Sequence, residues 1–465
     1  MLPVAPAPIF IKEASMKQMQ APASSVPKAK QFPVDFMWGS ATAAHQVEGG
    51  NANADLWALE RATPSLFKEP SGDAIDHWNR FSDDMALLAA LGIYHYRFSV
   101  EWARIEPEEG VFSQAALSHY QNCIDTCLRL GIKPSLTLQH FTLPLWVARR
   151  GGFAAHDFPD LFARYCDRIA RSLRGFDTVF TINELNVPIL VEPRVTALLS
   201  SETGKVLAAA AEKASGAKLN SAFLFTPSAV ILGNGLAAHA KGRNAIKAVR
   251  PDCQVGVTLS IQDEQAAPGA EAIRDARREA IYGRLLDAVK GDDFIGVQTY
   301  TRMVAQPDGT VGPEPGHPLT MMGYEDRPQA LAEVCRFVWE RTNTPILVTE
   351  NGWAGENDER RVAFIHEALN CLHDVIGEGV KVTGYFYWSL FDNFEWLDGY
   401  RPKFGIIGVD RSTQRRQIRR SAFVYGQIAR ANELSPAEQS LPLAGVPEAP
   451  QGSAAGGVPV GMNLG

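Results

Sequence analysis

The stretch Ile346-Leu347-Val348-Thr349-Glu350-Asn351-Gly352 decides the fold, because an apolar run stops there abruptly at a polar turn. A short, continuous run of apolar and β-branched residues is typical of a strand that is buried on both faces, as in parallel sheets. In an α/β barrel, the carboxyl ends of such strands carry the functional side chains. Glu350 therefore marks the end of a predicted strand and a candidate functional position.

Seven further runs of strand character accompany 346–350, at residues 36–42, 94–99, 133–139, 178–183, 254–260, 294–300 and 382–388. Segments with a helical period separate them, including 80–91, 114–130, 159–173, 272–289 and 328–341. Gly92 and Gly131 follow two of these segments, where the end of a helix favours a left-handed backbone. Eight strands that alternate with helices predict an α/β fold, a single (β/α)8 TIM barrel with elaborated βα loops.

Three segments stand apart from this alternation. Residues 192–220 are rich in Ala and precede a predicted helix near 235–248, and we interpret them as an enlarged loop on the active-site face. Residues 1–31 are rich in Ala, Pro, Ser and Lys, and residues 435–465 are rich in Pro, Gly and Ala. Such compositions bury too little apolar surface to fold, so we expect disordered extensions on both sides of a barrel domain at 32–434.

The composition excludes several classes of protein. Of the 465 residues, 46% are hydrophobic and 21% charged, and the net charge of −7 is spread along the chain. No basic block indicates nucleic acid, no apolar run approaches the roughly 20 residues that cross a bilayer, and residues 1–31 lack the apolar centre of a secretion signal. The six cysteines form no C-x-x-C pair, and no N-x-S/T sequence occurs. These features favour reduced thiols and a cytoplasmic location, and they predict neither a metal site nor a cofactor.

Glu184 is a second acidic residue at a predicted strand end, in Thr181-Ile182-Asn183-Glu184. It follows the fourth strand and Glu350 ends the seventh, so both carboxyl groups should face the same mouth of a barrel. The tripeptide Asn-Glu-Leu carries little information by itself, because it recurs at 432–434 without a preceding strand. The strand context is what singles out these two glutamates.

Several segments follow one another in a distinctive order: FMWGSATAAHQVEG at 36–49, YRFSVEW at 96–102, HFTLP at 140–144, Asn183-Glu184, TENG at 349–352 and YWSLFDNFEW at 387–396, which runs on to Phe404-Gly405. With these segments the sequence resembles glycoside hydrolase family 1, the retaining β-glucosidases and β-galactosidases, over about residues 32–427. The resemblance implies a retaining exo-β-glycosidase, first of all a β-glucosidase, with β-galactosides and β-fucosides as further substrates. It would hydrolyse O-glycosidic bonds of β-linked oligosaccharides or of aryl and alkyl β-glycosides through a glycosyl-enzyme intermediate.

The resemblance also implies a role for each matched residue. Glu184 would be the catalytic acid/base and Glu350 the nucleophile, the two carboxyl groups that retention requires. Arg97 and Tyr300 would lie beside Glu350 and keep it ionised, with Asn183 in support. The sugar would be held by hydrogen bonds from amide and carboxylate groups and by aromatic stacking, from Gln46, His140, Asn183, Trp388, Glu395, Trp396 and Phe404.

Some positions depart from the family's pattern. The family has proline after the acid/base, aspartate in the His-x-Asp-Leu-Pro segment, tryptophan after the Gly-Gly pair and asparagine before the tyrosine, whereas this chain has Leu185, Thr142, Phe153 and Gln298. The segment after Asn186 also differs. Because proline restricts the residue before it, its loss affects how Glu184 is held. These changes concern aglycone preference and efficiency, and both glutamates remain.

Three other functions stay open at this point. A phospho-β-glycosidase would need a serine and a lysine near Glu395, whose charge repels a phosphate. A non-catalytic sugar-binding protein would have no need of Arg97 and Tyr300, although Leu185 keeps this alternative open. A transglycosidase would use the same pair with an apolar acceptor site that excludes water. The sequence does not separate it from a hydrolase, and it does not reveal the sugar, the aglycone or the oligomeric state.

Overall fold

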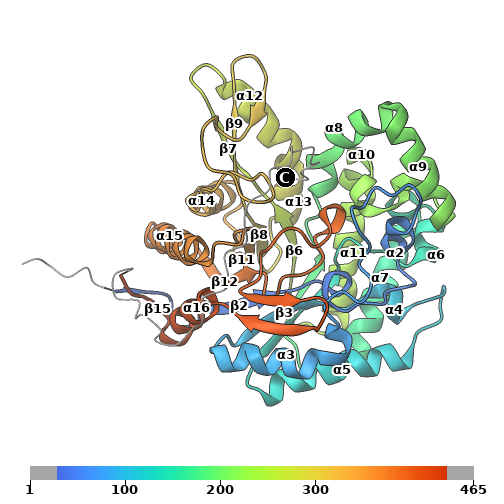
Figure 1. The fold of residues 1–465 in the computed structure, drawn as a ribbon, viewed down its shortest axis with the longest axis horizontal. Coiled ribbons are helices and arrows are strands. Elements are labelled where there is room, and N and C mark those ends of the chain that lie inside the picture. Colours follow the sequence, from blue (N-terminus) through green and yellow to red (C-terminus); the bar gives the residue numbers. More distant parts are fainter. Residues whose placement is uncertain (1–28, 437–465) are drawn as a thin grey trace, which may run out of the picture.

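The computed structural model describes residues 29–436, and these form a closed barrel of eight parallel strands (Figure 1). Around the barrel the order is β11-β12-β2-β3-β4-β5-β6-β8. The strands are β2 (Met37–Ala41), β3 (His95–Ser99), β4 (Lys133–Gln139), β5 (Thr178–Ile182), β6 (Gln254–Ser260), β8 (Ile295–Gln298), β11 (Ile346–Asn351) and β12 (Val382–Trp388). Each predicted strand matches one of these, so the predicted TIM barrel is confirmed.

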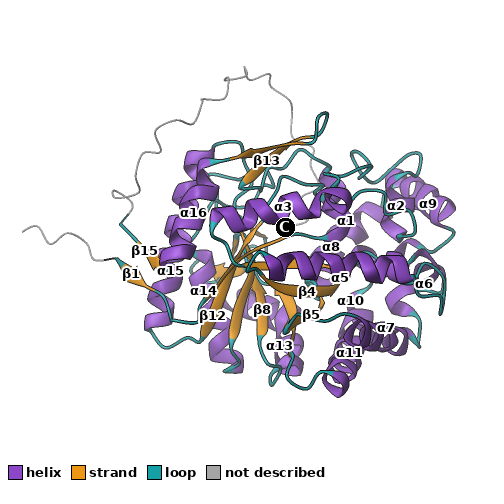
Figure 2. Cartoon of the chain, turned by 90° about the horizontal axis from the view of Figure 1, so that it is seen from below, coloured by secondary structure: helices purple, strands orange, loops and turns teal. Residues whose placement is uncertain are grey.

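Helices surround the barrel on its outside, as Figure 2 shows. The main ones are α3 (His77–Leu91), α5 (Gln114–Arg129), α7 (Phe158–Ser172), α11 (Leu236–Val249), α12 (Glu271–Arg278), α13 (Arg284–Val289), α14 (Ala330–Thr342), α15 (Asp358–Gly377) and α16 (Arg420–Ala431). The two predicted stop signals are confirmed, because Gly92 and Gly131 have φ angles of 81° and 73°. Among residues 29–436, no helix has both the length and the apolar character that crossing a bilayer requires.

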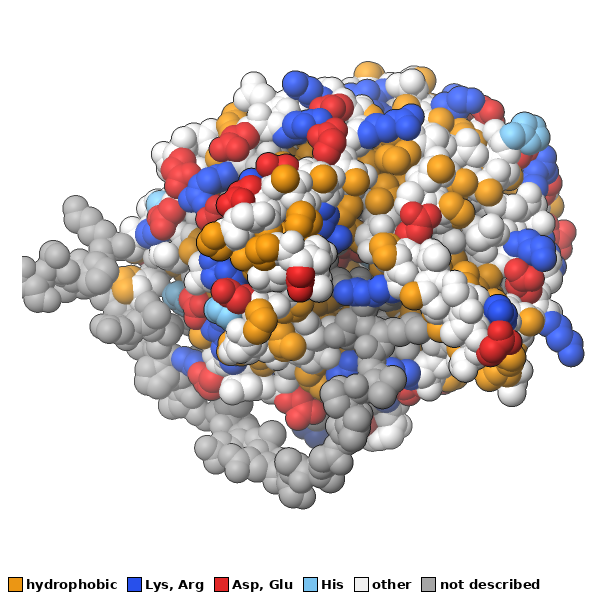
Figure 3. Space-filling model, turned by 90° about the horizontal axis from the view of Figure 1, so that it is seen from above, with side chains coloured by type: hydrophobic (Ala, Val, Ile, Leu, Met, Phe, Trp, Pro, Cys, Tyr) orange, Lys and Arg blue, Asp and Glu red, His pale blue; other side chains and the backbone are white. Residues whose placement is uncertain are grey.

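Smaller elements elaborate the connections between strands and helices. A sheet in the order β10-β9-β7 is formed by β7 (Asp263–Ala266), β9 (Arg302–Ala305) and β10 (Val311–Gly312), and a two-stranded ribbon by β13 (Ile407–Asp410) and β14 (Arg415–Ile418). Acidic and basic side chains are interspersed over the face shown in Figure 3. The charge of this face is therefore mixed, without one dominant sign.

The prediction of an enlarged loop over residues 192–220 is wrong. The segment forms α8 (Val187–Ser200) and α9 (Glu202–Ser215). Ser201 begins the second helix as its N-cap, with Oγ accepting a hydrogen bond from the backbone N–H of Gly204 at 3.0 Å. Gly216 ends that helix in the left-handed region with φ 68°. The Ala-rich composition that suggested a loop is in fact favourable for a helix between two such caps.

The first and last described segments of the chain meet beside the barrel. β1 (Lys30–Gln31) pairs antiparallel with β15 (Glu433–Leu434), so Lys30 and Gln31, which the sequence placed in the N-terminal extension, are part of the fold. The side chain of Asn432 ties this pairing to the barrel, because its Oδ1 accepts from Nε1 of Trp38 at 2.8 Å. The second Asn-Glu-Leu sequence, at 432–434, thus has a structural role in this pairing. The rest of the two predicted extensions, 1–28 and 437–465, lies outside the described residues.

An apolar cluster closes the barrel beneath its functional end. Phe180, Phe294, Leu347 and Phe386 form a small core of their own, and Met37 packs against it. The guanidinium carbon of Arg97 lies 4.9 Å from the centre of the Phe180 ring. Layers of inward side chains from different strands fill α/β barrels in this way. The cluster therefore forms a dry floor, above which the polar groups gather.

Gly426 tests the packing of the outer ring of helices. It lies in α16 so close to α3 that a Cβ atom would be 1.9 Å from the backbone oxygen of Leu91. We expect Gly426→Ala to destabilise the protein by about 1–3 kcal/mol, because backbone on both sides must move. Gly377 ends α15 with open space around its Cα, and Gly377→Ala should be neutral or stabilising by up to about 1 kcal/mol. Thermal unfolding of both variants measures the difference, and equal melting temperatures would contradict this packing.

Candidate active site

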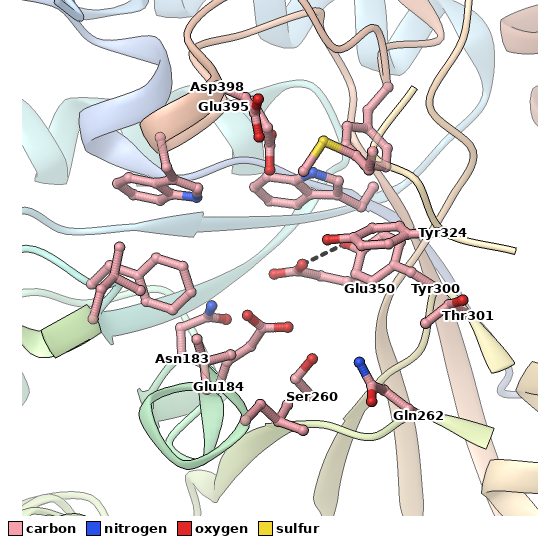
Figure 4. Close-up of a pocket in the computed structure, with 18 of the residues that line it drawn as sticks. Asn183, Glu184, Ser260, Gln262, Tyr300, Thr301, Tyr324, Glu350, Glu395 and Asp398 are labelled. Atoms are coloured by element: carbon pink, nitrogen blue, oxygen red, sulfur yellow. Dashed lines mark hydrogen bonds between the residues drawn. The ribbon is translucent and has the colours of Figure 1, made fainter. Parts of the chain in front are cut away.

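A cavity opens at the carboxyl ends of the barrel strands and holds about 850 Å³, its open mouth included. Figure 4 shows its walls, with side chains contributed by several strands and loops. The lining residues are His140, Phe141, Asn183, Glu184, Val187, Leu190, Leu224, Ser260, Ile261, Gln262, Tyr300, Thr301, Met322, Tyr324, Glu350, Trp388, Glu395, Trp396, Leu397, Asp398 and Phe404. Both predicted glutamates are among them, so the shared mouth expected from the strand positions is confirmed.

The two glutamates approach each other from different sides of this cavity (Figure 4). Glu350 lies within β11, and Glu184 stands two residues beyond the end of β5. The side chains of both glutamates are buried. Glu184 has a φ of 46°, a left-handed conformation that costs a side-chain-bearing residue energy and often occurs at functional sites. The surrounding contacts must therefore hold Glu184 in place.

Three donors surround the carboxylate of Glu350. Nη1 of Arg97 donates to Oε1 at 2.6 Å, Nε2 of Gln298 donates to the same oxygen at 3.0 Å, and the hydroxyl of Tyr300 donates to Oε2 at 2.7 Å. Burial raises the pKa of Glu350 above its usual value, and the charge of Arg97 and the bonds from Tyr300, Arg97 and Gln298 oppose this rise. These donors stabilise the ionised form, which is the form that the sequence predicted beside Arg97 and Tyr300.

Glu184 has a different electrostatic environment. Burial and the nearby charge of Glu350 raise its pKa to about 8, against a smaller lowering by the neighbouring Ser260 hydroxyl and the charge of Arg97. Two buried carboxyl groups this close cannot both ionise without cost. The proton of the pair therefore resides on Glu184 at neutral pH, because Glu350 has the guanidinium and the larger set of donors.

Asn183 links the two sides of the site. Its Oδ1 accepts from Nη2 of Arg97, from Nε2 of Gln298 at 2.9 Å and from Oγ1 of Thr258 at 3.1 Å. A carbonyl with three donors has no capacity left for a ligand, so the amide NH2 is the group that faces the cavity in Figure 4. The orientation of Asn183 is thus fixed by its neighbours.

The residues predicted to hold a sugar fall into two groups. His140, Trp388, Glu395, Trp396 and Phe404 line the cavity. Gln46 lies behind it, where its Nε2 donates to the backbone oxygen of Phe394 at 2.7 Å and to Oε2 of Glu395 at 3.3 Å. Oε1 of Gln46 and Nδ1 of His140 are buried without a protein partner. Buried polar atoms are nearly always hydrogen-bonded, so such atoms at a cavity point to a ligand rich in hydroxyl groups.

Aromatic rings form one wall of the cavity. The His140 ring lies 5.8 Å from Trp388 and 6.0 Å from Trp396, both nearly parallel to it, and Phe141 lies 4.9 Å from Trp396. Stacked rings of this kind cover the C–H face of a pyranose. Burial and the charges of Glu350 and Asp398 raise the pKa of Glu395 well above its usual range. The site therefore combines a flat apolar wall with a cluster of carboxyl groups.

Several residues that line the cavity were not predicted from the sequence. Ser260 ends a predicted strand, so the same strand-end rule that found Glu184 applies to it. Gln262 follows closely, before β7 begins. Tyr324 lies in the irregular segment before α14, where no pattern in the sequence indicates a site.

Thr142, one of the departures from the family's pattern, donates to Oε2 of Glu101 at 2.8 Å.

One group of side chains outside the cavity has the spacing of metal ligands. Within residues 29–436, the ligand atoms of Glu314, His317 and Glu325 all lie within 4.8 Å of one another. Arg302 already forms ion pairs with both of these glutamates. One guanidinium therefore bridges both carboxylates and neutralises one of the two charges, and we assign the group as an ion-pair cluster that supports β9.

Comparisons with known proteins agree on one family. The model for glycosyl hydrolase family 1 matches residues 28–284 and 289–434. Beta-glucosidase A of Thermotoga maritima is 31% identical over 461 aligned residues, which cover 87% of this chain and 99% of that protein. Thermostable beta-glucosidase B of Thermobispora bispora is 32% identical, with 90% and 95% covered.

Solved structures of the same kind are similar. The crystal structure of beta-glycosidase BGL167 is 44% identical, with a TM-score of 0.82 and with 91% of this chain and 100% of that chain covered. The beta-glucosidase from Thermotoga maritima in complex with glucoimidazole is 26% identical, with a TM-score of 0.75 and coverages of 87% and 99%.

Tyr300 allows the environment of Glu350 to be tested directly. Tyr300→Phe removes a donor to the ionised form, so the pKa of Glu350 should rise by about one unit. Carboxyl ¹³C NMR of protein labelled at glutamate, with Glu350→Gln for assignment, measures it. Tyr324→Phe removes a hydroxyl from the same cavity and should leave the pKa within about 0.3 units, because the groups that lower it are Arg97, Tyr300 and Gln298. An unchanged or lower pKa in Tyr300→Phe would show that this hydroxyl does not stabilise the carboxylate.

Proposed function

This chain belongs to glycosyl hydrolase family 1 and is a glycoside hydrolase, and from this premise we propose that Glu184 and Glu350 cleave β-glucosides with retention of configuration. One observation carries the proposal. Two buried glutamates face each other across a cavity, and their surroundings assign a proton to Glu184 and a charge to Glu350. That is the pairing of an acid with a nucleophile that a double displacement needs.

The first displacement uses both groups at once. Glu184 transfers its proton to the glycosidic oxygen while the carboxylate of Glu350 attacks the anomeric carbon from the opposite face. The C–O bond to the leaving group breaks, the alcohol departs, and an ester joins the sugar to Glu350. Tyr300, Gln298 and Arg97 hold the attacking oxygens in place before the reaction, because each already bonds to them.

The second displacement reverses the roles. Formation of the ester removes the charge of Glu350, and that charge is one of the two main causes that raise the pKa of Glu184. The pKa of Glu184 therefore falls, and its carboxylate can take a proton from the water that attacks the anomeric carbon. Glu350 leaves with the electron pair of the ester bond. Two inversions at one carbon give net retention.

The cavity suits an unmodified hexose. Nδ1 of His140, which has no protein partner, and the carboxyl group of Glu395 offer hydrogen-bonding atoms to sugar hydroxyls, and Trp388 and Trp396 offer apolar faces. Glucose is the sugar we assign, since two relatives are named beta-glucosidases. The proposal includes β-galactosides and β-fucosides, because Glu395 and Trp396 suit them equally. A 6-phosphate is disfavoured, because Glu395 and Asp398 line the cavity and none of the described lining residues is a lysine or an arginine.

The leaving-group side of the cavity is mainly apolar. In the proposed mechanism the aglycone departs beside Glu184, and α8 begins three residues after that glutamate. Val187 and Leu190 of α8 line the cavity there, as does Ile261, which follows Ser260. An apolar wall at this position favours aryl and alkyl aglycones over a second sugar. We also propose a cytoplasmic location, supported by six cysteines that form no disulfide.

Exogenous azide distinguishes the roles of the two glutamates by stereochemistry. Glu350→Gly should abolish hydrolysis and leave a void on the face from which the nucleophile attacks. Azide in that void displaces a good leaving group once, so the product should be an α-glucosyl azide. Glu184→Ala should still form the ester, and azide from the other face should then give the β-glucosyl azide. NMR of the products reads the configuration.

Three outcomes would contradict this assignment. A β-azide from Glu350→Gly would exclude residue 350 as the nucleophile, and near-normal turnover of that variant would exclude it equally. Turnover of neither an aryl β-glucoside nor an aryl β-galactoside by the unaltered protein would favour a non-catalytic sugar-binding protein.

Alkyl β-glucosides test the apolar aglycone side, because their alcohols differ in length far more than in acidity. From methyl to hexyl glucoside, kcat/KM should rise by up to about fourfold for each methylene, since a fully buried methylene contributes about 0.8 kcal/mol. Leu190→Asn should flatten this series. Val206→Asn, on the exposed face of α9, is the matched control and should preserve it. Preference for cellobiose over hexyl glucoside would contradict an apolar aglycone side.

A further inference from the structure

A set of hydrogen bonds ties the turn after Glu184 to the end of β6. The backbone N–H of Glu184 donates to Oγ1 of Thr258 at 2.8 Å, and the backbone N–H of Leu185 donates to the backbone oxygen of Thr258 at 3.1 Å. Asn186 completes the set with two bonds to the backbone of Ser260. Its Nδ2 donates to the oxygen at 2.6 Å, and its Oδ1 accepts from the N–H at 2.8 Å.

These bonds replace a strand pairing that has already ended. The pairing of β5 with β6 runs from Thr178 opposite Gln254 to Phe180 opposite Gly256, and the two strands then diverge. Glu184 follows in its left-handed conformation with φ 46°. A residue in such a conformation keeps it where its neighbours over-determine the backbone. The four bonds from 184–186 to Thr258 and Ser260 supply that constraint.

Leu185 contributes a bond that a proline could not make. The family's pattern has proline after the acid/base, and proline has no N–H to donate to Thr258. Leu185 is fully buried, and its Cδ1 would lie 3.0 Å from a Cβ built on Gly235, at the end of the π-helical turn η4 (Ile231–Gly235). The turn is thus held from both sides, by hydrogen bonds on one and by packing on the other.

Ser260 is left with a single free group. Asn186 occupies both its N–H and its backbone oxygen, which leaves the hydroxyl of Ser260 beside the carboxyl group of Glu184. Figure 4 shows Ser260 beside Glu184 on the wall of the cavity. The backbone contacts of Asn186 therefore fix where this hydroxyl stands, and the hydroxyl in turn contacts the group that must transfer a proton.

We propose that Ser260 is a positioning residue for Glu184, with Asn186 holding the backbone from which its hydroxyl reaches the carboxyl group. The inference rests on the proposed role of Glu184 as acid/base. In the protonated acid, the serine O–H donates to the carbonyl oxygen, so the other oxygen directs its proton to the leaving group. In the second displacement, the same O–H stabilises the carboxylate that activates water.

Leaving-group dependence separates positioning of the acid from general structural support. Ser260→Ala should lower kcat/KM for methyl or hexyl β-glucoside by about 5- to 30-fold, because alcohols of high pKa need the proton. For 2,4-dinitrophenyl β-glucoside, whose phenolate leaves without protonation, kcat/KM should stay within about twofold. Ser260→Thr, which keeps the hydroxyl, should restore most of the loss. Ser221→Ala, a buried serine of the short helix η2 (Leu219–Ser221), is the matched control and should leave both values unchanged.

The pH profile gives a second, independent measurement. A hydroxyl that donates to the ionised carboxyl lowers the pKa of Glu184, so its removal raises this pKa. The basic limb of kcat/KM, which follows the loss of the Glu184 proton, should move to higher pH in Ser260→Ala. A shift of a few tenths to about one unit is expected for one hydrogen bond to a charged group.

Each possible result decides between the proposals. If Ser260→Ala behaves like the unaltered protein while Glu184→Gln loses the alkyl glucosides, Ser260 does not position the acid. An equal loss on alkyl and dinitrophenyl glucosides, with an unmoved basic limb, would show a purely structural role and also overturn the inference. If Glu184→Gln itself retains alkyl glucoside hydrolysis, the proposed function fails first, and the inference fails with it.

Discussion

The buried guanidinium of Arg97 is the constraint on which the rest of the site depends. Arg97 has no exposed surface, and a buried cation is tolerated only where charge and hydrogen bonds compensate it fully. Its Nε donates to Oγ1 of Thr137 at 3.1 Å, its Nη1 to Glu350 at 2.6 Å and its Nη2 to Asn183. These partners come from β4, β11 and the end of β5, so the compensation exists only after the barrel has closed.

This constraint makes two otherwise similar carboxyl groups different. Glu350 lies against the cation and so becomes the counter-ion, whereas Glu184 is buried beside Ser260 with the charge of Glu350 nearby. The apolar floor below Arg97 strengthens the effect, because Phe180 and its neighbours exclude water from one side of the network. The contact with Arg97 thus distinguishes the proposed nucleophile, Glu350, from the proposed acid, Glu184.

The barrel and the glutamate pair could be predicted from the sequence because both depend on local signals. A strand covered on both faces needs an uninterrupted apolar run, and each of the eight predicted runs forms a barrel strand. A polar residue that ends such a run faces the mouth of the barrel. Helix α8 was missed because Pro193 lies in its interior and its apolar residues form no single stripe, and α9 was missed because its ends depend on Ser201 and Gly216. Tyr324 was missed because only tertiary packing brings its irregular segment to the cavity. The position of Gln46 behind Glu395 equally depends on contacts that are distant in sequence.

Two departures from the family's pattern lie at the pair, Leu185 next to Glu184 and Gln298 against Glu350. The side of Glu350 keeps Arg97 and Tyr300, since a permanent charge in a dry site requires a cation and donors at fixed positions, and few side chains supply them. An acid that carries its proton at neutral pH needs burial and a fixed orientation, which many combinations of residues can provide. Here Leu185, Asn186, Thr258 and Ser260 provide the orientation in place of a proline. Gln298 connects the two sides of the site. Its amide donates to Glu350 on one side, and to Asn183 and Thr258 on the side of Glu184.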